Sequence, residues 1–125
     1  MSKENLEEAA SKILLTDHGV WWEDENEEFQ HLQNRLLEQS ESFDKVCEWL
    51  QDVNKIKNIN ENSDSYYMKH IVEDDLGGYI SNGVFIAAAI YCGFKYKLFK
   101  ESLNVTFNIS QRSINTKLKS LKIVA

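Results

Sequence analysis

The residues best suited to chemistry lie between positions 65 and 82. His70 and Glu73 are three positions apart, and Asp74 follows directly. On a helix, this spacing places an imidazole and carboxylates on one face, as in carboxylate-bridged metal sites. A working metal site needs a further pair of ligands, and the sequence supplies none. We therefore predict no metal, cofactor or catalytic residue, and a metal-dependent enzyme centred on His70 and Glu73 is the weakest hypothesis.

Candidate nucleophiles give no better support for an enzyme. We expect Cys47 and Cys92 to lack nearby basic residues that would lower a thiol pKa. Ser81 lies in Tyr-Ile-Ser-Asn-Gly, which is not the nucleophile elbow of hydrolases, and it suits a helix N-cap. The chain is accordingly predicted to be non-enzymatic.

Five polar residues around this region exceed what a core requires. One interpretation is a buried hydrogen-bonded network that fixes the turn between two helices. The other is a binding surface for a ligand or partner. The network is the favoured interpretation for this group, which comprises Lys69, His70, Glu73, Ser81 and Asn82.

Residues 65–110 resemble a small family of uncharacterised bacterial proteins of prophages, plasmids and genomic islands. The matching residues are Ser65-Tyr66, Lys69-His70, Glu73, Gly77-x-Tyr79, Ser81-Asn82-Gly83, Phe85-Ile86, Ala88-Ala89, Gly93-Phe94 and Phe107-Asn108-Ile109-Ser110. The resemblance implies an accessory or regulatory factor of a mobile element. It implies no mechanism, because the family has no established activity.

The C-terminal part is basic and carries interleaved aromatic residues. Between positions 95 and 125 one acid, Glu101, stands against seven cations, with Tyr96, Phe99 and Phe107 among them. The cations are Lys95, Lys97, Lys100, Arg112, Lys117, Lys119 and Lys122. This pattern suits phosphate contact combined with stacking, although a solvated basic face would look the same. Our leading hypothesis is therefore a binding protein that contacts nucleic acid through this surface.

The first half of the chain is strongly acidic. Residues 1–62 hold six basic and fifteen acidic residues, a net charge of −9, whereas residues 63–125 hold eight and five, a net charge of +3. An acidic run at 23–28 adjoins Trp21 and Trp22, and aromatic residues beside charge often anchor interfaces. The alternative hypothesis is thus a protein-binding module or inhibitor, with a homodimer also open.

The pattern of apolar residues predicts an all-α protein of five or six helices in one domain. Prolines are absent from the sequence, which favours uninterrupted helices. The expected helices cover residues 4–15, 24–39, 43–56, 65–76, 82–92 and 111–121. The segment 82–92 is apolar almost all round and should be buried at the centre. Residues 95–99 and 105–109 alternate in polarity, which allows a small two-stranded ribbon.

The remaining expectations concern organisation and location. An acidic helical half, 1–58, is predicted to join a helical and basic part, 65–125, through a polar loop at 58–65. The first residues lack the apolar region of a secretion signal, and the longest apolar run is too short to span a bilayer. A cytoplasmic protein without membrane contact is therefore expected.

Overall fold

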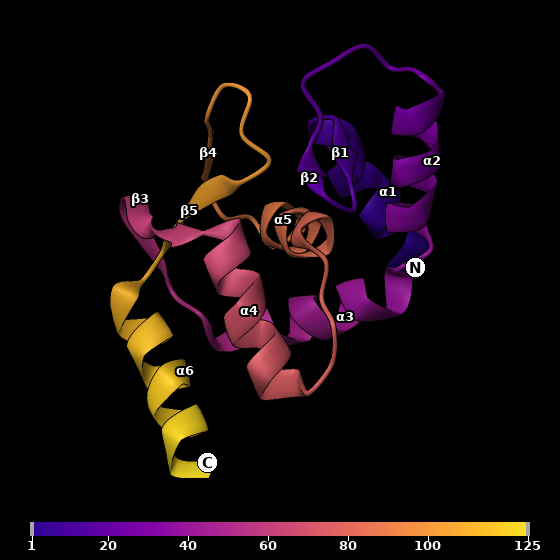
Figure 1. Ribbon diagram of the computed structural model, residues 1–125. Coiled ribbons are helices and arrows are strands. Elements are labelled where there is room, and N and C mark those ends of the chain that lie inside the picture. The colour runs from indigo at the N-terminus through magenta and orange to yellow at the C-terminus, as the bar shows by residue number, and fades with distance from the viewer. Residues whose placement is uncertain (1, 125) are drawn as a thin grey trace.

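The computed structural model describes the backbone of residues 2–124 and the side chains of residues 3–121. Its elements in chain order (Figure 1) are α1 (Ser2–Lys12), β1 (Leu15–Thr16), β2 (Gly19–Val20), α2 (Glu27–Leu37), α3 (Ser40–Trp49), a 3-10 turn (Leu50–Asp52), β3 (Lys55–Asp64), α4 (Ser65–Leu76), α5 (Asn82–Tyr91), β4 (Tyr96–Leu98), β5 (Val105–Ile109) and α6 (Gln111–Val124).

Helix α5 occupies the centre of the fold, as the sequence predicted. Every residue from 82 to 90 is buried, because α1, α3 and α4 pack around it and the larger sheet covers another side (Figure 1). The Phe85 ring meets the Phe107 ring of β5 with centroids 5.8 Å apart. The Ser81 hydroxyl accepts from the Val84 N–H at 3.2 Å, which confirms Ser81 as the N-cap.

The larger sheet is antiparallel, with the strand order β3-β5-β4. The expected ribbon is confirmed, since Tyr96 pairs with Phe107 and Leu98 with Val105. Strand β5 is the middle strand rather than an edge, because β3 pairs along its other side. A second, two-stranded sheet consists of β1 and β2, which form a short hairpin.

The prediction of an all-α fold is wrong. The protein is 56% helical, and five strands hold a further 18% of its residues. The predicted polar loop at 58–65 lies mostly in β3, and the helix expected to reach residue 56 ends at Trp49. Strand β3 shows no alternation of apolar residues because nearly all of its side chains are exposed or half-buried.

The core draws on both halves of the chain. Buried residues of α1 and α3 join those of α4, α5 and β5 in one continuous cluster. The acidic and basic halves therefore meet across α5. Within residues 2–124, every helix is too short or too polar to cross a lipid bilayer.

Candidate functional site

The tight turn between β1 and β2 packs directly on the first turn of α5. The Asp17 carbonyl accepts from the Gly83 N–H at 3.0 Å. A Cβ on Gly83 would overlap the Thr16 carbonyl. Gly19 has a φ of +132°, which favours glycine, and a Cβ there would overlap the Leu103 carbonyl. Two glycines thus allow three segments to meet: the turn, the start of α5 and the loop before β5.

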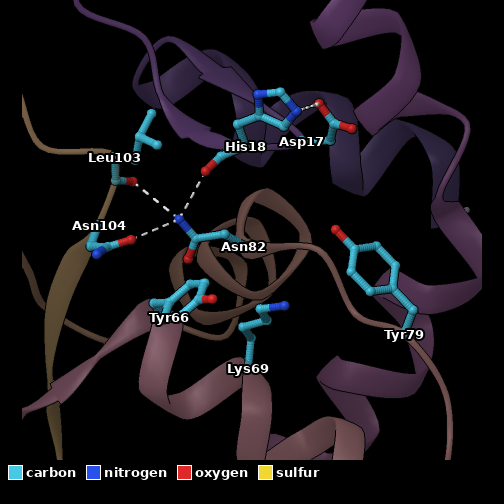
Figure 2. A pocket seen from close by; sticks show the side chains of 8 residues that line it. All are labelled: Asp17, His18, Tyr66, Lys69, Tyr79, Asn82, Leu103 and Asn104. Carbon is cyan, nitrogen blue, oxygen red and sulfur yellow. Dashed lines mark hydrogen bonds and ion pairs between the residues drawn. The ribbon is translucent and has the colours of Figure 1, made fainter.

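Asn82 connects these three segments. The residue is 6% exposed. Its Nδ2 donates to the His18 carbonyl and to Asn104 Oδ1, each at 3.0 Å, with a longer contact of 3.3 Å to the Leu103 carbonyl (Figure 2). Its Oδ1 has no hydrogen-bond partner among the described residues. Because buried polar atoms are almost always satisfied, this oxygen marks a place where a donor is needed.

Asn82 lines a cavity of about 460 Å³ (Figure 2). Its size falls within the roughly 300–1,000 Å³ of ligand sites. The lining residues come from the β1–β2 turn, α4, the link after α4, the start of α5 and the loop before β5; they are Asp17, His18, Tyr66, Lys69, Tyr79, Asn82, Leu103 and Asn104. Of the polar group singled out in the sequence, two members, Lys69 and Asn82, line this cavity.

Asp17 contributes a buried carboxylate that sequence reasoning missed. The residue is 3% exposed. Its Oδ2 lies 3.1 Å from Arg35 Nη2, and its Oδ1 lies 3.9 Å from His18 Nε2. Among the described residues Oδ1 has no hydrogen-bond partner. Asp17 and Asn82 thus each have a buried oxygen without a hydrogen bond among the described residues, and only Asp17 Oδ1 has an ionisable neighbour, His18.

Lys69 supplies the cation of the cavity. Its side chain is 8% exposed, and Nζ lies 3.4 Å from both carboxylate oxygens of Glu73. The same ammonium lies 4.9 Å from the centroid of the Tyr79 ring and 5.3 Å from that of Tyr66. Two aromatic faces and one carboxylate thus hold a nearly buried ammonium group, which fits cation–π stabilisation.

Glu73 is saturated by three different donors. It accepts from Lys69, from the Ile80 N–H at 3.0 Å and from His70 Nδ1 at 2.9 Å. Partial burial opposes its ionisation, but the Ile80 N–H and the charges of Lys69 and His70 outweigh that effect and lower the pKa of Glu73. The described residues include no group of three or more His, Cys, Asp or Glu arranged to hold a metal.

Replacing Glu73 with Gln should destabilise the protein by about 2 kcal/mol at pH 7, because it removes the charge that pairs with Lys69. A lowered folded-state pKa means that Glu73 stabilises the fold above its unfolded pKa of about 4.3. That contribution disappears as the pH falls through the folded-state pKa. The difference between wild type and Glu73→Gln should therefore shrink below about pH 4, measured by urea unfolding at several pH values. A pH-independent difference would contradict this role.

Ser81 completes the picture of the predicted network. Besides capping α5, its hydroxyl donates to Gln39 Oε1 at 2.7 Å, so it joins the N-cap residue of α3 to the start of α5. The polar group therefore divides into two parts. Glu73 contacts Lys69, His70 and the Ile80 N–H of the link after α4, whereas Lys69 and Asn82 also line an open cavity.

The predicted basic surface also divides into two parts. Lys95, Lys97 and Lys100 are exposed on β4 and its flanking residues, and Tyr96 is 36% exposed. The other cations, Arg112, Lys117 and Lys119, belong to α6, which extends from the far end of β5 (Figure 1). The side chain of Lys122 lies outside the described residues. The structure therefore does not bring the predicted cations into one patch.

Lys117 is engaged within the fold. Its side chain is 17% exposed, and Nζ lies 2.8 Å from Asp52 Oδ1 and 4.6 Å from the centroid of the Trp49 ring. The hydrogen bond from Lys117 lowers the pKa of Asp52. Lys117 is thus better described as a structural cation than as a contact for an external phosphate.

Strand β3 supplies two further lysines, Lys55 and Lys57, which sequence reasoning placed at the end of a helix and between that helix and the polar loop. Lys95 Nζ donates to the Lys57 carbonyl at 3.4 Å, and Lys97 Nζ lies 3.8 Å from Glu61. Lys55 Nζ lies 4.6 Å from the ring centroid of Phe94, which is the residue before Lys95. We call the residues Lys55, Lys57, Lys95 and Lys97 the lysine cluster.

The acidic run at 23–28 is exposed throughout. Trp21 is half-buried against the Phe29 ring, with centroids 5.5 Å apart. Trp22 is 41% exposed, although its Nε1 donates to the Ser102 carbonyl at 2.6 Å. An accessible tryptophan does therefore lie beside the acidic residues.

The two cysteines are half-buried and lie together where α3 meets the end of α5. A hydrogen bond between the thiols, followed by burial, raises the pKa of Cys47. The same hydrogen bond outweighs burial at Cys92 and, with the charge of Lys55, lowers the pKa of Cys92. The expectation that no base lies near either thiol is therefore wrong, because β3 brings Lys55 to Cys92.

Comparisons with known proteins give no match to a family model, to a curated protein or to a solved structure. The resemblance to proteins of mobile elements stays a prediction. The cavity and the lysine cluster are therefore the two features of the molecule that bear on function.

Proposed function

We propose that the protein is a non-enzymatic accessory factor that binds single-stranded nucleic acid weakly through the lysine cluster. The observation that carries this proposal is the pair of contacts that cross β5. Lys95 Nζ reaches the Lys57 carbonyl, and Lys97 Nζ reaches Glu61, so the lysine side chains of β4 and its flank extend across β5 to β3. A cluster of this kind matches the spacing of charge along a phosphate backbone better than scattered cations do.

The surroundings of the cluster suit an extended strand. One acid, Glu61, pairs with Lys97, while Lys57 and Lys95 are exposed. Tyr96 alternates to the opposite face of β4 from Lys97, so the aromatic ring beside the lysines is that of Phe99, whose centroid lies 5.2 Å from Lys97 Nζ and which offers a surface for stacking. The net charge of −6 opposes any polyanion, which is the reason to expect weak and strongly salt-dependent binding.

The test replaces Lys57 and Lys95 together with Gln. Because each phosphate contact on a single strand contributes about 0.7 to the slope of log affinity against log salt, the slope should fall by about 1.4. The matched control replaces Lys12 and Lys45, two exposed lysines of α1 and α3, and so makes the same change in net charge. Fluorescence anisotropy with a labelled 12-nucleotide strand, titrated at several salt concentrations, measures both slopes.

Two results would contradict the proposal. One is the absence of binding by the wild type at low ionic strength; the other is an equal loss of slope in the control variant. The alternative function is a protein-binding surface at the acidic run 23–28. If that function is correct, the wild type and the lysine variant should bind a basic polypeptide equally well, and neither should bind the strand.

A further inference from the structure

The cavity beside Asn82 differs from an ordinary surface hollow because one of its lining residues has a buried acceptor without a hydrogen-bond partner among the described residues. One nearly buried acceptor, Asn82 Oδ1, lacks a partner among the described residues, whereas Asp17 Oδ1 lies 3.9 Å from His18 Nε2. Leaving such an atom unpaired costs about 1–3 kcal/mol. Tight packing of two glycines against backbone carbonyls maintains this arrangement. A group that donates an N–H bond would satisfy the Asn82 oxygen.

The opposite side of the cavity offers a donor and two aromatic surfaces. Figure 2 shows Lys69 directed from α4 toward Tyr79, below the side chain of Asn82. Tyr79 is 72% exposed and Tyr66 is 52% exposed, so much of each ring is accessible although Lys69 lies against both. Exposed aromatic residues at the rim of a polar cavity are suited to stacking a flat ring.

The combination specifies the ligand by chemistry. A flat ring is needed for the tyrosines, an N–H donor for the Asn82 oxygen, and an acceptor or anionic group for the Lys69 ammonium. A nucleobase with an exocyclic amino group has the flat ring, the donors and ring acceptors, and its phosphate adds an anion. Thymine lacks the exocyclic amino group.

We infer that the cavity binds one unstacked, amino-bearing nucleobase, such as cytosine, stacked against Tyr79 with its amino group donating to Asn82 Oδ1. This inference rests on the proposed function for its source in a strand, although a free nucleotide carries the same chemistry. The loop that supplies Leu103 and Asn104 to the cavity begins at the end of β4, beyond Lys97. A strand on the lysine cluster can therefore continue along this loop to the cavity.

The decisive variant is Tyr79→Ala, because a residue 72% exposed can be replaced without disturbing the core. Affinity for an oligo(dC) 12-mer should fall about tenfold, which corresponds to the loss of one base–aromatic stack. Tyr79→Phe keeps the ring and should bind within about twofold of wild type. Tyr67→Ala is the matched control, since Tyr67 is 45% exposed on the same helix as Tyr66 but does not line the cavity.

A second measurement separates binding in the cavity from a structural effect. The wild type should prefer oligo(dC) over oligo(dT), and Tyr79→Ala should lose that preference while keeping its salt slope. If the salt slope depends on Lys57 and Lys95 but Tyr79→Ala leaves affinity and preference unchanged, the cavity inference is wrong and the proposed function stands.

Binding of a free nucleotide is tested by adding cytidine monophosphate in the absence of an oligonucleotide. In the wild type, changes in the NMR signals of the Asn82 side-chain amide and the Tyr79 ring would support binding in the cavity even if no oligonucleotide binds. In Tyr79→Ala, the change in the Asn82 amide signal should be absent. If the wild type binds no oligonucleotide and cytidine monophosphate moves neither signal, both proposals fail.

Discussion

Replacing Gly83 with Ala should destabilise the protein by about 3 kcal/mol. The added methyl group would overlap the Thr16 carbonyl and press on the Asp17 backbone, and neither can rotate away because both belong to the turn that Gly83 itself holds by a hydrogen bond. Alanine is favoured over glycine inside a helix by about 1 kcal/mol, but this gain is smaller than the steric strain. Urea unfolding followed by tryptophan fluorescence measures the change.

The chain contains its own control for this substitution. A Cβ on Gly78 meets nothing within 4 Å, and the φ of Gly78 is not positive. Gly78→Ala should therefore leave stability unchanged or raise it by up to about 1 kcal/mol, through the lower entropy of the unfolded chain. Equal stability of Gly83→Ala and wild type would show that the β1–β2 turn can move off α5, and the cavity would then not be preformed.

The parts of the fold with a strong periodic signal were predictable. Helix α4 runs from Ser65 to Leu76 and α5 from Asn82 to Tyr91, close to the predicted bounds. Both have apolar positions at helical spacing and end near glycine, so local preference and burial agree. The pairing of β4 with β5 was also found, because alternation of apolar residues marks β5, where one face packs on α5.

Strand β3 could not be predicted from apolar alternation because its pairing with β5 depends on hydrogen bonds from polar side chains, which composition does not reveal. Asn60 Nδ2 donates to the Ile109 carbonyl at 3.0 Å, and Asn108 Nδ2 donates to the Ile56 carbonyl at 2.7 Å. Between its register shifts, side chains thus supply hydrogen bonds that a regular ladder would take from the backbone. In sequence, a run of Asn and Ser with this role looks the same as a linker.

For a related reason, only some residues of the candidate site could be predicted from the sequence. Lys69 and Asn82 were conspicuous because polar residues interrupt an apolar helix pair. Asp17 was not singled out, since nothing local indicates that its carboxylate is buried and paired with Arg35. Contacts between residues this far apart in sequence depend on the tertiary fold, which a pattern of single residues does not encode.

Replacing Ser63 with Ala should destabilise the protein by about 3 kcal/mol. Ser63 is fully buried, and its hydroxyl accepts from the Phe107 N–H at 3.1 Å while its single hydrogen is shared between the Phe107 and Asn60 carbonyls, each at 2.6 Å. Alanine leaves the Phe107 N–H without this partner and removes the hydrogen that the two carbonyls share, and each unsatisfied buried group costs about 1–3 kcal/mol. The loss should appear in urea unfolding and as faster hydrogen exchange at the Phe107 amide.

The matched control is Ser11→Ala, because the Ser11 hydroxyl also donates to a backbone carbonyl, that of Glu8 at 2.7 Å, but does so at the surface. Water replaces that bond, so the change should stay within about 0.5 kcal/mol. If Ser63→Ala behaves like Ser11→Ala, the β3–β5 pairing does not depend on this hydroxyl. If instead it loosens β3 selectively, Lys57 moves away from Lys95 and the salt slope for strand binding should fall together with stability.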